Sequence, residues 1–146
     1  MVYLSSTSVY AEAGGGWVDE TSAVAEDDSR ALAMVTAERA TLRAGGTVVR
    51  CAGIYGPGRQ IRPNAGGPER WLNVIEVEDA ARAVGAVLRK GGEIFNVCED
   101  EALPRGEAGG VWAEDSVRSR RSKRVRNQKL KETGWNPMCA AGRSKN

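Results

Sequence analysis

The chain has 146 residues, with 21 Lys and Arg against 19 Asp and Glu, three Cys and no His, and this length fits a single domain. The absence of histidine excludes catalytic sites that pair serine or cysteine with histidine, and no cysteine spacing is typical of zinc ligands, so we expect no metal site. No apolar run approaches the roughly 18 residues of a membrane-spanning helix and no signal-peptide pattern opens the chain, so we expect a soluble intracellular protein, in the cytoplasm or in an organelle such as the plastid.

The basic residues are concentrated in one segment. Residues 116–131 hold eight of the 21 Lys and Arg and no acid, which leaves 13 basic against 19 acidic residues, a charge of −6, for the rest of the chain. Such a segment can contact the phosphates of a nucleic acid, but it has no interleaved aromatic residues for base stacking. We therefore expect it to be solvated or to dock on the acidic body, and we do not expect nucleic-acid binding.

The opening stretch, Val2–Tyr10, has apolar ends and four hydroxyl side chains at positions 5–8. We interpret Val2–Ser6 as a buried parallel strand. Ligands of open α/β sheets bind outside the carboxyl ends of the strands, so these hydroxyls are well placed to line a site. The alternative that the residues leave open is a strand that runs into a hydroxyl-capped turn.

Two helices are predicted further along the chain. Residues 11–28, rich in glycine and acids, are expected to form a mobile surface excursion. Ser29 is the predicted N-cap of a helix over residues 30–43, and Asp79 is the predicted N-cap of a helix over residues 79–90; a glycine pair follows each of them. The apolar stripes expected to be buried are Leu32, Val35 and Leu42 on the first helix and Ala81, Val84 and Leu88 on the second.

Short β-branched runs predict strands between and after these helices. The predicted strands are 47–51, 74–77 and 93–97. Residues 53–59 are predicted to form a Gly/Pro turn that holds Tyr55, and residues 60–73 to be irregular. Residues 125–135 are predicted to form one short helix. The alternation of strands and helices is the signature of a parallel α/β layer.

Six stretches together resemble one family. LSSTSVY, residues 4–10, looks like the serine-bearing strand of the extended short-chain dehydrogenase/reductase superfamily, which comprises NAD(P)-dependent sugar epimerases, dehydratases and their atypical relatives. Five further stretches are similar to segments of that family and follow in the family's order: TAERA, VVRCAGIYGPGR, NVIEVEDAARAV, GEIFNVCEDEALPRGE and SKRVRNQKLKETGW. Descent explains six motifs in the right order better than chance does.

The resemblance implies an α/β fold. We expect a partial Rossmann-like parallel sheet with flanking helices, without the amino-terminal nucleotide-binding half and with a basic tail. Residues 1–107 are expected to form the partial NAD(P)-binding, epimerase-like domain, and residues 108–146 a loop and the basic carboxyl-terminal segment. The strand Val2–Ser6 is then expected to have an unpaired edge, because the family's sheet is built outward from strands that this sequence does not contain.

The resemblance also implies site residues. Ser6 matches the family's catalytic hydroxyl, four residues before Tyr10. Ser5, Gly53 and Tyr55 are the implied cofactor-binding residues, with NAD or NADP as the cofactor and a small molecule as the substrate. Gly53 stands where many sugar epimerases place an asparagine, which argues against a nucleotide sugar.

Three features of the family are missing from the sequence. These are the Gly-rich turn that cradles the pyrophosphate, the acidic residue that holds the ribose hydroxyl, and the Tyr-x-x-x-Lys pair. Aligning Ala37 and Glu38 with the family's Ala-Glu puts Arg30 and Met34 at the pair's positions, and neither can perform general acid/base catalysis at neutral pH.

We therefore expect an atypical member or fragment that has no catalytic activity of its own and does not bind NAD(P) alone. Two alternatives stay open: a non-catalytic module that pairs with another chain through an exposed sheet edge, and a weak nucleic-acid binder that uses the basic tail.

Overall fold

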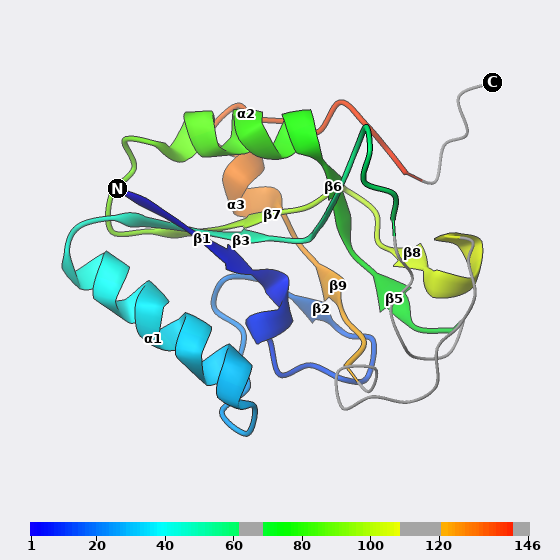
Figure 1. Ribbon diagram of the computed structural model, residues 1–146, viewed down its shortest axis with the longest axis horizontal. Helices are drawn as coiled ribbons and strands as arrows, with labels where there is room; N and C mark the ends of the chain where they lie inside the picture. Colours follow the sequence, from blue (N-terminus) through cyan, green and yellow to red (C-terminus); the bar gives the residue numbers. More distant parts are fainter. Residues whose placement is uncertain (62–68, 109–120, 142–146) are drawn as a thin grey trace.

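A three-stranded parallel sheet lies at the centre of the molecule (Figure 1). The computed structural model describes residues 1–61, 69–108 and 121–141. The strands of the sheet, in the spatial order β1-β3-β7, are β1 (Val2–Ser6), β3 (Thr47–Cys51) and β7 (Ile94–Val97). The predicted strands at the start of the chain and at 47–51 are confirmed, and β7 begins one residue later than predicted.

β1 forms one edge of this sheet. Among the described residues it pairs with β3 alone, from Val2 opposite Thr47 to Ser6 opposite Cys51. The prediction of a buried strand is therefore wrong in part: Ser5 is buried, but Leu4 is 58% exposed because no further strand or helix covers it in the described structure.

Helices α1 (Ser29–Arg43) and α2 (Val77–Val87) lie on opposite faces of the sheet (Figure 1). Their N-caps are Asp28 and Glu76, so the predicted caps Ser29 and Asp79 are wrong. In each case the earlier carboxylate accepts two backbone N–H groups of the first turn, which a residue already inside the helix cannot do. No helix among the described residues is long and apolar enough to cross a membrane.

The stripe that α2 presents to the sheet differs from the one predicted, and on α1 only Val35 of the predicted stripe is buried. On α2 the buried apolar residues are Ala80, Ala83 and Val87, each one position before a predicted stripe residue, and Leu88 is 58% exposed. On α1 the buried residues are Ala31, Val35, Glu38 and Thr41. Alanines let each helix approach the sheet closely. Because many of the apolar residues on these helices are small, the sequence alone does not indicate which of two adjacent stripes will face the sheet.

Three pairs of short strands flank the sheet. They are β2 (Trp17–Val18) with β9 (Arg124–Val125) in parallel, β4 (Gly53–Tyr55) with β6 (Val74–Glu76) in parallel, and β5 (Trp71–Leu72) with β8 (Leu103–Pro104) in antiparallel orientation. β8 leads into the 3-10 helix η2 (Arg105–Ala108). Residues 53–55 are thus a strand, not part of a turn, and β5 interrupts the segment predicted to be irregular. The predicted strand at 74–77 ends at Glu76 because α2 begins at the next residue.

The segment predicted as a surface excursion is attached to the body at two places. Val18 is buried in the core beside β9, and Ala25 is buried where its N–H donates to the carbonyl of Val9 at 2.7 Å. β9 is distant in sequence and Val9 lies before the excursion, so the composition of residues 11–28 alone does not reveal either contact.

The described part of the basic segment docks on the body. Docking was one of the two arrangements expected from the sequence, the other being a solvated segment. Arg121 pairs with Asp27 and Asp28, Lys129 with Glu93, and Lys131 with Asp100. The segment also contributes the core residues Val125 and Leu130, and Trp135, which follows it, lies in the core as well. Its helix α3 (Gln128–Lys131) is shorter than the predicted helix at 125–135, because residues 124 and 125 pair with β2 instead. The predicted domain boundary after residue 107 adjoins residues 109–120, which lie outside the described ones, and stays a prediction.

Candidate functional site

The carboxyl ends of the three parallel strands share one edge of the sheet. Ser6, Cys51 and Val97 lie in one row there, since Ser6 pairs with Cys51 and Cys51 with Val97. Ligands of open parallel sheets bind outside this edge. The residues that follow these strand ends therefore form the candidate site. They are the 3-10 helix η1 (Thr7–Val9) after β1, β4 after β3, and Glu99 after β7.

Ser6 caps η1. Its Oγ accepts a hydrogen bond from the N–H of Ser8 at 3.1 Å. This is the hydroxyl-capped turn that the sequence left open as the alternative. Because the cap uses the oxygen as an acceptor, the O–H of Ser6 is able to donate to a ligand oxygen at the strand end. The catalytic role of Ser6 stays a prediction.

Ser5 faces the opposite side of β1, because successive side chains of a strand alternate. It is buried, and its Oγ donates to Oε1 of Glu38 on α1 at 2.5 Å. The structure thus separates Ser5 from Ser6 and gives Ser5 a contact that holds α1 on the sheet. Its predicted cofactor contact stays a prediction.

Glu38 and Arg50 form a buried ion pair that the sequence analysis did not single out. Arg50 donates from Nε to Oε1 at 2.9 Å and from Nη2 to Oε2 at 2.7 Å. Burial lowers the pKa of the Arg50 guanidinium, but its interactions with Glu38 and Tyr10 together outweigh that effect, so the pKa is raised. The guanidinium lies 4.9 Å from the ring centre of Tyr10, whose hydroxyl donates to Oδ1 of Asn96 at 2.7 Å. This network joins β1, α1, β3 and β7.

Gly53 and Tyr55 lie on β4, directly after the carboxyl end of β3. The N–H of Gly53 donates to the carbonyl of Asn73 at 3.0 Å, and the hydroxyl of Tyr55 donates to Oε1 of Glu99. Burial, together with the bond to the Glu99 carboxylate, raises the pKa of Tyr55 above its ordinary value. The phenol therefore stays protonated at neutral pH and can donate a hydrogen bond but cannot act as a base.

The sequence analysis did not single out Glu99, although it lies in the family-like stretch GEIFNVCEDEALPRGE, because nothing in the local pattern links it to Tyr55. Glu99 follows β7, is buried, and also accepts the N–H of Ala141 from the carboxyl-terminal segment at 2.7 Å. Burial raises the pKa of its carboxyl group, and the negative charges of Asp79 and Asp100 add to that shift. Glu99 thus connects Tyr55 to residue 141 across the candidate site.

Replacing Glu99 by glutamine is expected to change how stability depends on pH. A raised pKa means that the folded chain binds more protons than the unfolded chain, so the contribution of Glu99 falls as pH rises from the unfolded value of about 4.3 through the folded value. The unfolding free energy of the wild type minus that of Glu99→Gln should therefore decrease as pH increases through this window, in denaturant titrations at several pH values. The exposed Glu101→Gln serves as the control and should show no such trend. A difference that rises with pH would contradict the assignment.

The helix positions that align with the family's Tyr-x-x-x-Lys pair are both on α1. Arg30 is exposed and Met34 is half-buried. Arginine keeps its proton and methionine has none to transfer. The proton-transfer chemistry of these positions is therefore not available from this chain.

The chain is similar to several solved structures. A conserved protein of unknown function from Silicibacter pomeroyi is 31% identical, with a TM-score of 0.78, and the match covers 97% of this chain and 62% of that one. A dTDP-glucose 4,6-dehydratase from Bacillus anthracis, solved with NAD, is 19% identical with a TM-score of 0.77, covering 97% and 57% of the two chains. A UDP-glucose 4-epimerase from Thermotoga maritima, solved with UDP-glucose, is 17% identical with a TM-score of 0.81, covering 97% and 59%. No protein-family model and no curated protein matches the sequence.

The chain has the fold of the NAD-dependent epimerases and dehydratases. This confirms, at the level of the fold, the resemblance read from LSSTSVY and the five stretches that follow it. The partial Rossmann-like parallel sheet is confirmed as well, since this chain spans only 57% to 62% of the length of the three structures.

The helix starts of this partial epimerase/dehydratase fold do not fit the pyrophosphate of NAD(P). That group binds where the free N–H groups of a helix N-terminus point at it. At the start of α1 the Asp28 carboxylate accepts two of these N–H groups, at 2.9 and 3.2 Å, and at the start of α2 the Glu76 carboxylate accepts two, at 2.7 and 3.3 Å. A carboxylate in that place repels a second anion. α3, the remaining described α-helix, has four residues.

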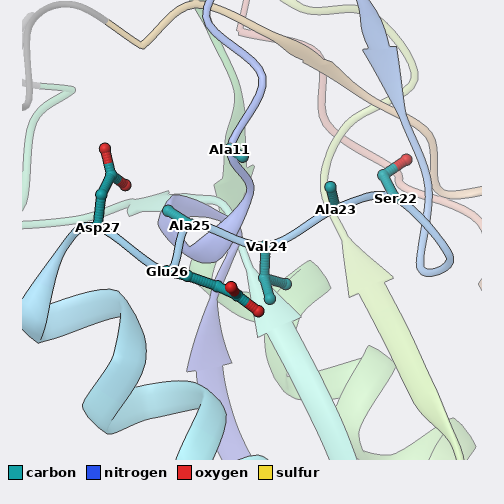
Figure 2. A pocket seen from close by; sticks show the side chains of 7 residues that line it. All are labelled: Ala11, Ser22, Ala23, Val24, Ala25, Glu26 and Asp27. Carbon is teal, nitrogen blue, oxygen red and sulfur yellow. The ribbon is translucent and has the colours of Figure 1, made fainter.

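A shallow hollow lies beside the segment that leads into α1 (Figure 2). Its volume is about 610 Å³, and it is lined by Ala11, Ser22, Ala23, Val24, Ala25, Glu26 and Asp27. The hollow contains none of the predicted site residues, and its two carboxylates disfavour a phosphate-bearing ligand. Its lining is otherwise mostly small apolar side chains, so we place the candidate site at the strand ends instead.

Over the described ranges, no group of three or more Cys, Asp and Glu residues could hold a metal ion. Cys51 and Cys98 are buried free thiols, and burial raises the pKa of Cys51 to about 11. A thiol with a raised pKa is a poor nucleophile and a poor metal ligand at neutral pH.

Proposed function

We propose that this chain provides the substrate side of an NAD(P)-dependent epimerase/dehydratase-like protein and has no oxidoreductase activity alone. The observation that carries the proposal is the position of β1. The strand that bears Ser6 at its carboxyl end is the edge of the described sheet, while the fold of the related structures continues over a further 38% to 43% of their length. The remainder of such a fold, on the same polypeptide or on a partner, would add to β1 and supply the cofactor site.

The strand-end residues suit binding and orientation of a small-molecule substrate. Ser6 can donate a hydrogen bond to a carbonyl or hydroxyl oxygen, and the phenol oxygen of Tyr55, which donates its proton to Glu99, can accept one. Neither group transfers a proton readily at neutral pH, and Arg30 and Met34 cannot replace the family's acid/base pair. These properties support the proposal that the chain binds a substrate but does not complete a redox reaction.

Calorimetric titration of the chain with NAD⁺, NADH, NADP⁺ and NADPH tests the proposal. We expect no binding with useful affinity, because carboxylates occupy the starts of α1 and α2. A dissociation constant in the low micromolar range, a binding free energy of about −8 kcal/mol, would contradict it.

The open edge of β1 also supports a second candidate, a non-catalytic module that pairs with another chain. The two candidates differ in what the pairing produces. A bound partner that confers nicotinamide cofactor binding supports the first candidate, and a partner that binds at β1 without conferring it supports the second. Nucleic-acid binding is not proposed, since Arg121, Lys129 and Lys131 of the basic segment pair with acids of the body.

A further inference from the structure

Two arginines and two tryptophans stack on one another at β2 and β9, which lie side by side next to the central sheet (Figure 1). The guanidinium of Arg124 lies 5.0 Å from the ring centre of Trp17 and 5.0 Å from that of Trp71. The guanidinium of Arg126 lies 4.8 Å from the ring centre of Trp17. We call these four residues the Arg–Trp stack. They come from segments that are far apart in the sequence, so the fold alone brings them together.

The strand pairing turns the stack toward solvent. Trp17 pairs with Arg124 across the two strands, while the next residues, Val18 and Val125, are buried in the core. Successive side chains of a strand point to opposite faces, so Trp17 and Arg124 lie on the outer face. Trp17 is 42% exposed, and Arg126 is exposed as well. The stack is therefore accessible to a partner.

Hydrogen bonds hold the stack in place before any partner binds. Nε of Arg124 donates to the carbonyl of Gly15 at 2.9 Å, and the N–H of Arg126 donates to the carbonyl of Val18 at 2.9 Å. Gly15 has a φ of 82°, and a Cβ at this position would lie 3.3 Å from the indole of Trp71. Glycine thus suits both the backbone conformation and the close approach of this loop to the ring. Because the guanidinium groups are already ordered, they lose little conformational entropy when they bind an anion.

The two arginines of the stack differ from the basic residues around them, because no acid pairs with them. Arg121, Lys129 and Lys131 of the same segment form ion pairs with acids of the body. None of the ion pairs among the described residues includes Arg124 or Arg126. Their guanidinium groups therefore keep N–H donors that a partner can use.

The acids close to the stack are bonded to other groups. Oδ1 of Asp19 accepts the hydroxyl and the N–H of Thr21, at 2.6 and 2.8 Å; these bonds lower the pKa of Asp19, and the charge of Arg126 adds to the shift. Oε1 of Glu12 accepts the N–H of Gly14 at 2.6 Å. Asp19 thus offsets part of the charge of Arg126 without forming an ion pair with it.

We propose that the Arg–Trp stack binds an acidic segment of a partner protein. Two carboxylates of such a segment pair with Arg124 and Arg126, since a guanidinium can donate two parallel hydrogen bonds to one carboxylate. Tryptophan and arginine are among the residue types that most often carry the binding energy of protein interfaces, and the exposed indole of Trp17 adds apolar contact beside the charges. The proposal does not depend on the proposed function, because the stack contains none of the candidate site residues.

An acidic peptide fits this surface better than a nucleic acid does. A nucleic acid that follows a basic surface needs several unpaired cations for its successive phosphates. The neighbouring Arg121, Lys129 and Lys131 are already paired with acids. Two arginines without an acid partner match a pair of carboxylates and not a continuous row of phosphates.

Titration of the whole chain with a hexaglutamate peptide, followed by tryptophan fluorescence, tests the proposal, because Trp17 lies against both guanidinium groups. We expect a saturable change that a hexaglutamine peptide does not produce. Arg126→Gln should weaken the binding of hexaglutamate at least tenfold. The matched control Arg39→Gln removes an exposed arginine on α1 and should leave the affinity unchanged.

A further variant separates a built site from general positive charge. Arg126→Lys keeps the charge but loses the planar group that stacks on Trp17 and grips a carboxylate with two bonds, so it should bind hexaglutamate more weakly than the wild type. Circular dichroism should show that all these variants stay folded, because the changed residues are exposed. The proposal is overturned if hexaglutamate binds no more tightly than hexaglutamine, if Arg39→Gln loses as much affinity as Arg126→Gln, if Arg126→Lys binds as tightly as the wild type, or if hexathymidylate binds at least as tightly as hexaglutamate.

Discussion

Replacing Glu38 by leucine is expected to destabilise the folded chain by about 3–5 kcal/mol. The change removes one partner of a fully buried ion pair and leaves the Arg50 guanidinium without the two oxygens that accept its hydrogen bonds at 2.9 and 2.7 Å. It also removes the acceptor for the Ser5 hydroxyl. A domain is typically stable by only about 5–15 kcal/mol, so this single substitution should remove much of the total.

Two matched variants separate the ion pair from other effects. Arg39→Leu changes an exposed residue on the same helix and should alter stability by less than about 0.5 kcal/mol. The double variant Glu38→Leu/Arg50→Met should be more stable than Glu38→Leu alone, because it leaves no unpaired buried charge. Denaturant unfolding measures all three. A Glu38→Leu variant as stable as Arg39→Leu would show that the pair is not buried as described.

The central strands could be predicted from the sequence because their residues carry a local signal. Val2–Ser6 opens with a β-branched and an aromatic residue, and Thr47–Cys51 is rich in β-branched residues; short runs of these residue types indicate strands whatever the rest of the chain does. The order of the family-like stretches then indicated the fold. The two-residue strands such as β5 could not be predicted in this way, because each exists only through pairing with a distant segment.

The polar centre of the structure was missed for a related reason. Glu38 lies on a helix among exposed arginines and Arg50 lies in an apolar strand, and charged residues are rarely buried unless they are paired. Neither position indicates the other, since they are twelve residues apart and meet only when α1 packs on β3. Glu99 was missed for the same reason, because its hydrogen-bond partners, Tyr55 and residue 141, come close to it only in the folded chain.

The second large effect is expected at the free edge of β1. This edge exposes backbone donors and acceptors of Val2–Ser6, and Leu4, the residue at its centre, is 58% exposed. Edges without charges or proline recruit further strands, and no charged residue occurs in this strand. We therefore expect the chain to self-associate at micromolar concentration through β1.

Leu4→Lys places a charge in the centre of this edge and should shift the chain toward the monomer. Leu88→Lys is the matched control, because Leu88 is equally exposed, at 58%, but lies at the end of α2, away from the strand edge. It should leave the association unchanged. Equal effects of the two substitutions would assign the association to general exposure of apolar side chains and not to β1.

The proposed function requires β1 to be an open edge to which more of the fold is added, and sedimentation velocity of the purified chain at micromolar concentration tests this directly. We expect a concentration-dependent mixture of monomer and larger species, which Leu4→Lys reduces. A single monomeric species with a cooperative thermal transition above about 55 °C, as an ordinary self-sufficient domain shows, would contradict it.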